Sequence, residues 1–341
     1  MRKVLLAGAG LMVAAMSAGA QSVSSSCPPG SNTNVGGVLI PDRTKASQDA
    51  CEMAVDVFRF MAPQLGLALT GGNATLGRGS TLGGPGHFSV GIRGNVFEGD
   101  LPQVQNFPTP SINGVAAPRT LPSKGQIVGL PTADAAIGIF GGVPLPLTSV
   151  GGIDLLLSAT YVPSVGDASS DVQIKPSQNL QIGYGVRVGL LQESIVVPGV
   201  SFTYLKRDLP TTTLSATSSN LDVNITDAKV KTSAFRLVAS KSLLLFGIAA
   251  GVGQDRYDQE ANVQATAKGS GLAVQSDVVP LAEKLNRTNY FLDLSLNMPI
   301  FKLIGEVGQV SGGTVETYNQ FSGGRADKSR TYGSVGFRLG F

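Results

Sequence analysis

From residue 87 onward, apolar and polar side chains alternate along this chain with a period of two. The clearest stretch is 289–298, where Tyr290, Leu292 and Leu294 fall on one side and Asp293 and Ser295 on the other. Successive side chains of a β-strand point to opposite faces. The pattern therefore predicts strands with one apolar face and one polar face.

The same alternation recurs often enough to predict about ten strands, within a range of roughly 8 to 14, with ends placed to within about 2–4 residues. The expected strands are 87–97, 132–141, 150–161, 180–190, 196–206, 232–241, 243–255, 288–298, 300–310 and 331–341. Each has about the 9–11 residues that a tilted strand needs to cross the hydrocarbon layer of a membrane.

The connections between these strands alternate between short and long. Short links lie at 142–149, 191–195, 241–242 and 299, and long polar ones lie at 98–131, 162–179, 207–231, 256–287 and 311–330. Outer-membrane barrels have short periplasmic turns and longer extracellular loops. We therefore expect an all-β fold, a transmembrane antiparallel up-and-down β-barrel over 87–341. The alternative is a secreted β-sandwich or repeat fold.

Composition excludes several other classes. Charged residues make up 14 % of the chain, where about a quarter is usual, yet beyond the N-terminus no run reaches ~18 apolar residues, as a membrane helix would require. A net charge of +3 without a basic cluster argues against nucleic acid as a partner. His87 is the only histidine, and it does not make a metal cage with two isolated cysteines, so we expect neither metal nor cofactor.

The N-terminus has the pattern of a secretory signal peptide over residues 1–20. Arg2 and Lys3 precede an apolar run, and 18–20 reads Ala-Gly-Ala, a small-residue cleavage pattern. An uncleaved membrane anchor is the alternative. Export favours an oxidising compartment, so we expect Cys27 and Cys51 to form a disulfide.

Residues 21–86 should form a periplasmic segment containing one amphipathic helix at 45–67. Its apolar stripe comprises Ala50, Met53, Ala54, Val57, Phe58 and Met61, and Pro63 and Gly66 should end it. We expect this helix to lie against the inner, periplasmic mouth of the barrel as a cap or to enter the lumen as a plug. A place on a partner or on the inner leaflet surface is the other reading.

Aromatic side chains are sorted towards the strand ends. Tyr161, Tyr204, Tyr257, Tyr290 and Tyr332 fall near the outer ends, and Phe88, Phe246, Phe301 and Phe341 near the inner ends. Two aromatic girdles at the membrane interfaces would explain this sorting.

The C-terminus resembles the last strand of bacterial outer-membrane β-barrel proteins. The residues that carry the resemblance are Val335, Phe337, Leu339 and the final Phe341. The resemblance implies that these residues are the signal read by the barrel-assembly machinery. It also implies a bacterial outer-membrane location with outer-membrane lipid around the barrel.

The layout, an N-terminal segment before a barrel, is distantly similar to that of long-chain fatty-acid and hydrocarbon transporters. Their Asn-Pro-Ala motif is missing, and those barrels have more strands. The chain more closely resembles poorly characterised outer-membrane barrel proteins that have a helical N-terminal segment and a glycine-rich entry to the first strand.

The polar faces carry charges of both signs that should face the lumen: Arg93, Asp134, Asp154, Arg187, Arg236, Asp255, Asp293, Lys302, Glu306 and Arg338. Opposed charges can pair across a narrow lumen and merely fill it, or they can line a water-filled path.

Two functions follow from this layout. The first is a narrow or gated channel for a small solute. The alternative is a closed structural or adhesive barrel that binds an outside partner through its long extracellular loops. We do not expect an enzyme, because outer-membrane hydrolases generally use a histidine at the outer rim, and His87 falls at the inner end of its strand.

Overall fold

The computed structural model describes residue 27, residues 34–35 and 38–39, and residues 41–340 except 76, 168, 270–271 and 299. The expected signal peptide at 1–20 and the terminal Phe341 lie outside these residues. A small hairpin, β1 (Asn34–Val35) with β2 (Val38–Leu39), precedes the helix α1 (Pro41–Thr70).

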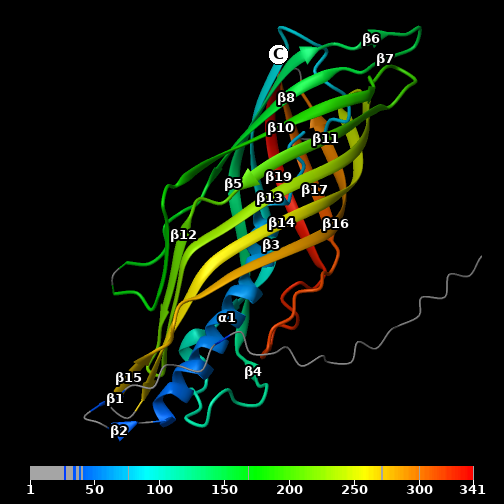
Figure 1. The fold of residues 1–341 in the computed structure, drawn as a ribbon. Coiled ribbons are helices and arrows are strands. Elements are labelled where there is room, and N and C mark those ends of the chain that lie inside the picture. Colours follow the sequence, from blue (N-terminus) through cyan, green and yellow to red (C-terminus); the bar gives the residue numbers. More distant parts are fainter. Residues whose placement is uncertain are drawn as a thin grey trace, which may run out of the picture.

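The described residues form a closed antiparallel barrel of ten strands in chain order, which confirms the expected fold (Figure 1). Each strand pairs with the next, and the last pairs back with the first through Tyr332 opposite Phe97. The strands are β3 (Phe88–Pro102), β5 (Ser123–Phe140), β8 (Ile153–Tyr161), β10 (Leu180–Leu191), β11 (Gly199–Asp208), β13 (Leu221–Leu243), β14 (Phe246–Gly269), β16 (Val279–Asn297), β17 (Phe301–Val310) and β19 (Arg330–Gly340).

Several strands are much longer than the sequence pattern indicated. β13 has 23 residues, β14 has 24 and β16 has 19, where about 9–11 suffice to cross a membrane. Much of 207–231 and 256–287, expected as loop, is therefore strand. Short pieces complete the long-loop end: η1 (Val104–Asn106), β4 (Thr120–Leu121), β9 (Val172–Pro176), β12 (Thr212–Thr217), β15 (Leu272–Gln275) and β18 (Gln320–Phe321). β6 (Val143–Pro144) and β7 (Ser149–Val150) form a hairpin in one short turn.

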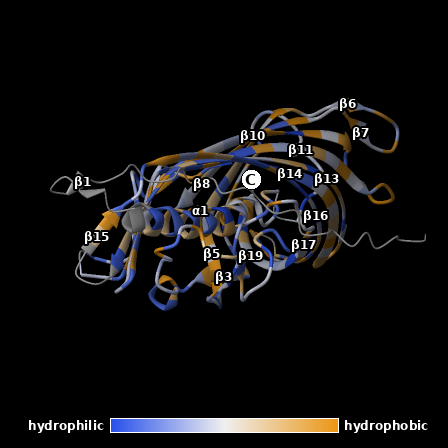
Figure 2. Ribbon diagram, turned by 60° about the horizontal axis from the view of Figure 1, so that its bottom comes forward, coloured by the Kyte–Doolittle hydropathy of each residue, from blue (hydrophilic) through white to orange (hydrophobic). Residues whose placement is uncertain are grey.

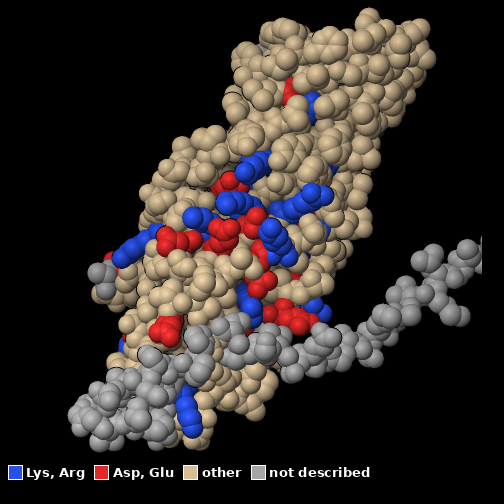
Figure 3. Space-filling model, viewed as in Figure 1, with Lys and Arg blue, Asp and Glu red and all other residues tan. Residues whose placement is uncertain are grey.

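An apolar belt surrounds the half of the barrel that ends in the short turns. Outward side chains there are apolar and exposed, among them Ile92, Leu294 and Val335. In Figure 3 charged side chains gather over the half that contains α1, whereas the half nearer the short turns shows almost none. A closed barrel with such a belt satisfies its backbone internally and presents hydrocarbon to lipid, as a membrane-spanning barrel must.

The aromatic sorting holds only in part. Tyr161 and Tyr290 are outward and exposed, and so are Phe88 and Phe246. Tyr257 and Tyr332 instead point inward, and each is only 2 % exposed. Each of these two tyrosines lies an odd number of residues away from the outward apolar residues of its own strand. The period of two therefore already places both on the inner face.

Helix α1 lies inside the barrel, at the mouth formed by the long loops. Its acidic side chains bind those loops: Asp49 accepts the backbone N–H of Ser111 at 2.7 Å, and Asp56 accepts that of Tyr318 at 2.8 Å. Figure 2 brings this mouth forward and shows α1 within the ring of strands. Of the two expected placements, a cap against the inner mouth is wrong, and a helix that enters the lumen as a plug is confirmed, although it lies at the long-loop end.

The helix also differs from the expected amphipathic one. It runs on past Pro63 and Gly66 to Thr70, and its acidic side is buried along with its apolar stripe. Ala50, Met53, Glu52 and Asp56 all have exposed fractions of 0 %. A proline inside a helix costs about 3 kcal/mol of helix stability. Burial of this helix on every side offsets that cost.

Candidate functional site: the luminal plug

The lumen of the barrel is filled by the chain itself. We call residues 66–84 the plug segment: it comprises the last turn of α1 and the extended stretch that follows. It runs from the middle of the barrel to the short-turn mouth, where β3 begins. The ten charged residues predicted to face the lumen lie on the inner face of the wall around it, and nine of them are buried.

Three arginines of the wall meet the C-terminal end of α1. Arg93 donates to the carbonyl oxygen of Gly71 at 2.6 Å, Arg207 to that of Leu69 at 3.0 Å and Arg236 to that of Thr70 at 3.3 Å. The last carbonyls of a helix have no partner within the helix and carry its partial negative charge. The arginines donate hydrogen bonds to these carbonyls and bring positive charge to the negative end of the helix. The helix end is therefore fixed at mid-lumen.

Each of these arginines also has a carboxylate. Asp134 pairs with Arg93 at 2.9 Å and with Arg207 at 3.3 Å, and Asp255 pairs with Arg236 at 2.6 Å. Deeper in the barrel, Arg187 pairs with Asp154 at 2.6 Å. The sequence suggested pairs across the lumen. Most of these pairs instead join neighbouring strands, because the plug segment occupies the space between.

Past the helix, the wall also binds the backbone of the plug segment. Glu306 accepts the N–H of Asn73 at 2.7 Å, and Asp154 accepts that of Leu82 with both carboxylate oxygens at 3.1 Å. Arg338 and Lys302 donate to the carbonyls of Thr75 and Gly77 at 2.9 Å and 3.0 Å. Buried backbone groups are thus paired although this stretch has no secondary structure.

The plug segment approaches the wall so closely that glycine is required at one point. A Cβ on Gly79 would lie 2.6 Å from the carbonyl oxygen of Gly199 and 2.7 Å from the amide nitrogen of Ser240. Both atoms are backbone atoms of the wall, so neither can move aside cheaply. Gly79 also donates its N–H to the Ser240 hydroxyl at 2.8 Å.

Sequence reasoning missed three residues of this network. Arg207 was assigned to a loop, although it shares a face with Ser201 and Thr203 at period two. Asn73 and Arg78 lie in the glycine-rich stretch before the barrel, where no pattern indicates an inner face. The fold alone brings them to the wall.

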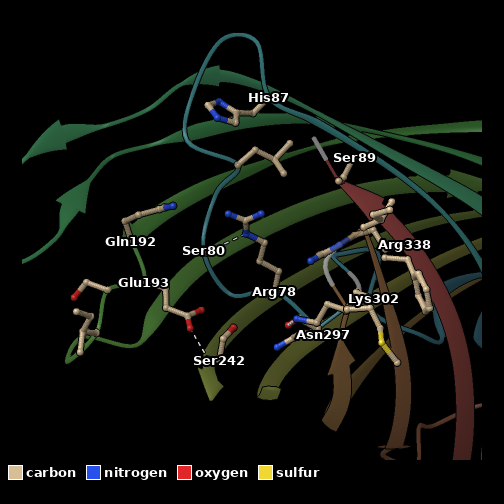
Figure 4. A pocket seen from close by; sticks show the side chains of 18 residues that line it. Arg78, Ser80, His87, Ser89, Gln192, Glu193, Ser242, Asn297, Lys302 and Arg338 are labelled. Atoms are coloured by element: carbon tan, nitrogen blue, oxygen red, sulfur yellow. Dashed lines mark hydrogen bonds between the residues drawn. The ribbon is translucent and has the colours of Figure 1, made fainter. Parts of the chain in front are cut away.

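Two cavities lie on either side of the plug segment. A polar one of about 760 Å³ opens at the short-turn mouth and is lined by Arg78, Lys302 and Arg338 among others (Figure 4). An apolar one of about 400 Å³ lies near the long-loop mouth, between Val57 and Met61 of α1 and Leu214, Val223 and Ile225 of the wall. We call them the inner vestibule and the outer pocket.

The expected disulfide joins Cys27 to Cys51, with the two Cα atoms 6.0 Å apart. It ties residue 27 to the third turn of α1. The long loops enclose this part of the helix, so the disulfide lies at the long-loop mouth and not at the short turns. His87 lines the inner vestibule. Within the described part of the chain no cluster of three potential metal ligands occurs, and no helix there is long and apolar enough to span a membrane.

The C-terminal strand presents its predicted assembly signal outward. Val335 is 64 % exposed, and Phe337 and Leu339 share its face. Phe301 of the neighbouring strand packs on Phe337 with ring centroids 5.2 Å apart.

These features define the class of this protein. It is a closed antiparallel barrel with an apolar belt, which is the architecture of outer-membrane β-barrel proteins. The lumen of this barrel is filled by its own N-terminal segment. No family model matches the sequence, and no curated protein matches it.

Solved structures similar in shape include the transport unit of the autotransporter AIDA-I from Escherichia coli. It has 9 % identity and a TM-score of 0.36, over 86 % of this chain and 99 % of that one. The Pseudomonas putida toluene transporter TodX has 11 % identity and a TM-score of 0.32, over 84 % and 97 %. The translocator domain of NalP from Neisseria meningitidis has 10 % identity and a TM-score of 0.33, over 74 % and 88 %. Similarities at this level say nothing of what this chain binds.

Proposed function

We propose that this protein is a bacterial outer-membrane barrel that lets a small solute pass when its plug segment moves. One observation carries the proposal: a separate piece of chain closes the lumen, and the side chains of the wall do not fill it alone. An eight-stranded barrel is just wide enough for its own side chains to fill it. Ten strands leave more room, and here α1 and the plug segment occupy that room.

Inward glycines let neighbouring residues pack close to the backbone of the wall. Glycines alternate along the inward side of two strands, at Gly183, Gly185 and Gly189 of β10 and at Gly247, Gly251 and Gly253 of β14. A Cβ at Gly189 would lie 2.9 Å from Thr81 of the plug segment, whereas at the other five positions it would meet neighbouring residues of the wall itself. If the plug segment withdrew, the space beside Gly189 would open. The path left behind would connect the outer pocket with the inner vestibule.

The contacts that hold the extended part of the plug segment can be exchanged for water. Residues 73–82 are held mainly by hydrogen bonds between wall side chains and backbone groups, in which the backbone donates at Asn73 and Gly79 and accepts at Thr75 and Gly77. Each such bond contributes about 0.5–1.5 kcal/mol net, or up to about 3 when one partner is charged. The outer pocket is lined mainly by apolar side chains, which favours a solute with an apolar part.

A crosslink between plug and wall tests the proposal. A Cβ at Gly77 would lie 3.7 Å from the Cβ of Ser295, within the range of a disulfide. We therefore suggest Gly77→Cys with Ser295→Cys, in a background with Cys27→Ser and Cys51→Ser. In planar bilayers the oxidised protein should show no openings, and reduction should restore them. Gly77→Cys alone is the matched control.

Equal conductance in the oxidised and reduced states would contradict the proposal, since the plug segment would then not lie on the path. Absence of conductance in both states and in the control would contradict passage altogether.

The second candidate is a closed barrel that binds an outside partner, and one observation favours it. The long-loop end is a folded platform, because β13, β14 and β16 extend far beyond the membrane span and enclose α1 as a core. If no variant conducts, binding of cell-surface or matrix components to this platform becomes the function to test. In either case we propose outer-membrane lipid and the barrel-assembly machinery as partners.

A further inference from the structure

We infer that the inner vestibule is a binding site for a small oxyanion, that is, a carboxylate or a phosphate. The cavity of about 760 Å³ lies between the plug segment, the ends of β17 and β19 and the short turns near Glu193 and Met298. The inference concerns binding alone and does not depend on whether the plug segment moves.

Three cationic side chains converge on this cavity from three different elements. Arg78 comes from the plug segment, Lys302 from β17 and Arg338 from β19, and Figure 4 shows Lys302 and Arg338 side by side next to Arg78. They are near enough that the charges of Arg78 and Arg338 both act on Lys302. Like charges held together in a partly enclosed space create a positive potential that attracts an anion.

This cluster differs from the other buried cations of the lumen. Arg93, Arg187, Arg207 and Arg236 each pair with an aspartate. Among the ion pairs between described residues, none involves Arg78 or Lys302, although Lys302 is only 9 % exposed. A buried charge without a counter-charge is costly, so an anion supplied from solution would stabilise the arrangement.

The cations are held in place and still have donors to offer. Lys302 Nζ donates to the carbonyl of Gly77 at 3.0 Å and Arg78 Nε to the hydroxyl of Ser80 at 3.1 Å. An ammonium group has three N–H donors and a guanidinium group five. The remaining donors of Arg78 and Lys302 can therefore form charge-assisted hydrogen bonds to an oxyanion.

Carboxylates offset the charges of Arg78 and Lys302 only in part: Glu193 acts on both cations, Asp154 on Arg78 and Asp293 on Lys302, and among the described residues none of these carboxylates forms an ion pair with either cation. Glu193 lies on the opposite side of the cavity in Figure 4, and there it accepts hydrogen bonds from the backbone N–H of Ser242 and from the Ser240 hydroxyl. Ser89 and Asn297 add uncharged polar groups close to Arg338 and Lys302. The donor set suits oxygen atoms of an anion and not a metal ion or an apolar solute.

The test is calorimetric titration of the full chain, purified in detergent, with inorganic phosphate and with citrate at constant ionic strength set by chloride. We expect saturable binding of at least one of the two. The two anions tell a phosphate site from a carboxylate site. Arg78→Gln should weaken binding by about tenfold or more, since one charge-assisted hydrogen bond to an anion is worth about 1.5–3 kcal/mol.

Arg325→Gln is the matched control, because this arginine is exposed at the opposite mouth, and it should leave binding unchanged. Each variant should first show the gel shift on boiling that marks a closed barrel. Lys302→Met is a second variant of the same site. The inference is wrong if the wild type binds neither anion at millimolar concentration, or if Arg78→Gln binds as tightly as Arg325→Gln.

Discussion

The two halves of this barrel use the same strands with opposite polarity. In the membrane half of β14, the outward residues are Phe246, Ile248 and Val252, and the inward ones are mostly glycine. Beyond Gly253 the outward residues become Gln254, Arg256, Asp258 and Glu260. Apart from Asp255 and Gln259, the buried inward ones become Tyr257, Ala261, Val263, Ala265 and Ala267. The alternation of apolar and polar residues continues, but the apolar residues move from the outward positions to the inward ones.

The reversal marks the place where the surroundings of the barrel change from lipid to water. In lipid the outer face must be apolar, and the polar groups face inward where other polar groups can pair with them. In water the apolar face must be buried, so it needs something inside the barrel to pack against. Helix α1 supplies that core through Met53, Val57, Phe58 and Phe60.

The two halves are therefore stabilised by different interactions. The membrane half depends on ion pairs and on hydrogen bonds to the plug segment, whereas the outer half depends on apolar burial. Substitutions matched by position along one strand should separate the two.

The largest effect should come from the core of the outer half. Phe60 is fully buried, and its ring stacks on that of Phe321 in the β17–β19 connection at 3.9 Å between centroids. Phe60→Ala should lower the free energy of unfolding of this half by about 3–5 kcal/mol. The measurement is limited proteolysis across residues 311–329 as a function of urea.

The control for this prediction is Phe88→Ala, whose ring faces lipid near the short turns. It should leave cleavage of the outer half unchanged. If Phe60→Ala also abolished the gel shift on boiling at the same urea concentration, the two halves would unfold together, and the division between them would be wrong.

A charge on the outward face should be tolerated in one half only. Leu294→Arg places a charge at an outward position of β16 that is 61 % exposed. It should cost about 2–4 kcal/mol in lipid vesicles. Asn286→Arg lies on the same face of the same strand, eight residues nearer the outer end, and should cost less than about 1 kcal/mol. Urea unfolding in vesicles followed by circular dichroism measures both, and equal costs would place the membrane boundary elsewhere.

The sequence predicted the membrane half well because its rule is simple. The rule is that apolar and polar residues alternate at period two, so that each strand has one apolar and one polar face. It identified all ten strands and assigned Arg93, Asp134 and the other inward charges to the inner face. The outer half obeys the same rule with its phase reversed. A pattern search that seeks apolar residues on a fixed face therefore reads 256–287 as polar loop.

The position of the helix could not be predicted from its own residues. A helix with Glu52 and Asp56 opposite an apolar stripe resembles a surface helix. Only loop groups more than 60 residues away in the chain make burial of the acidic side acceptable. Asp49 accepts the N–H groups of Ser111 and Ala116 and pairs with Arg119, and Asp56 accepts the N–H groups of Tyr318 and Asn319. The same holds for the plug segment, whose hydrogen-bond partners lie on nine of the ten strands of the wall and carry no local signal.

The smallest predicted effect is a pH dependence confined to the outer half. Burial raises the pKa of Asp56 from 3.8 to about 7, although N–H groups of Asn319 and Tyr318 donate to it and favour the ionised form. The nearby charge of Glu52 adds to the increase. The folded state thus binds a proton on Asp56 more tightly than the unfolded state does, so the contribution of Asp56 to stability is greatest below about pH 4 and falls as the pH rises through 7. Between pH 6 and pH 7 the loss should be about 1 kcal/mol.

Proteolysis of 311–329 should accelerate over this range in the wild type but not in Asp56→Asn, while the gel shift on boiling stays constant in both. An equal pH dependence in Asp56→Asn would assign the effect to another group, and a matching change in the gel shift would show that the membrane half shares it.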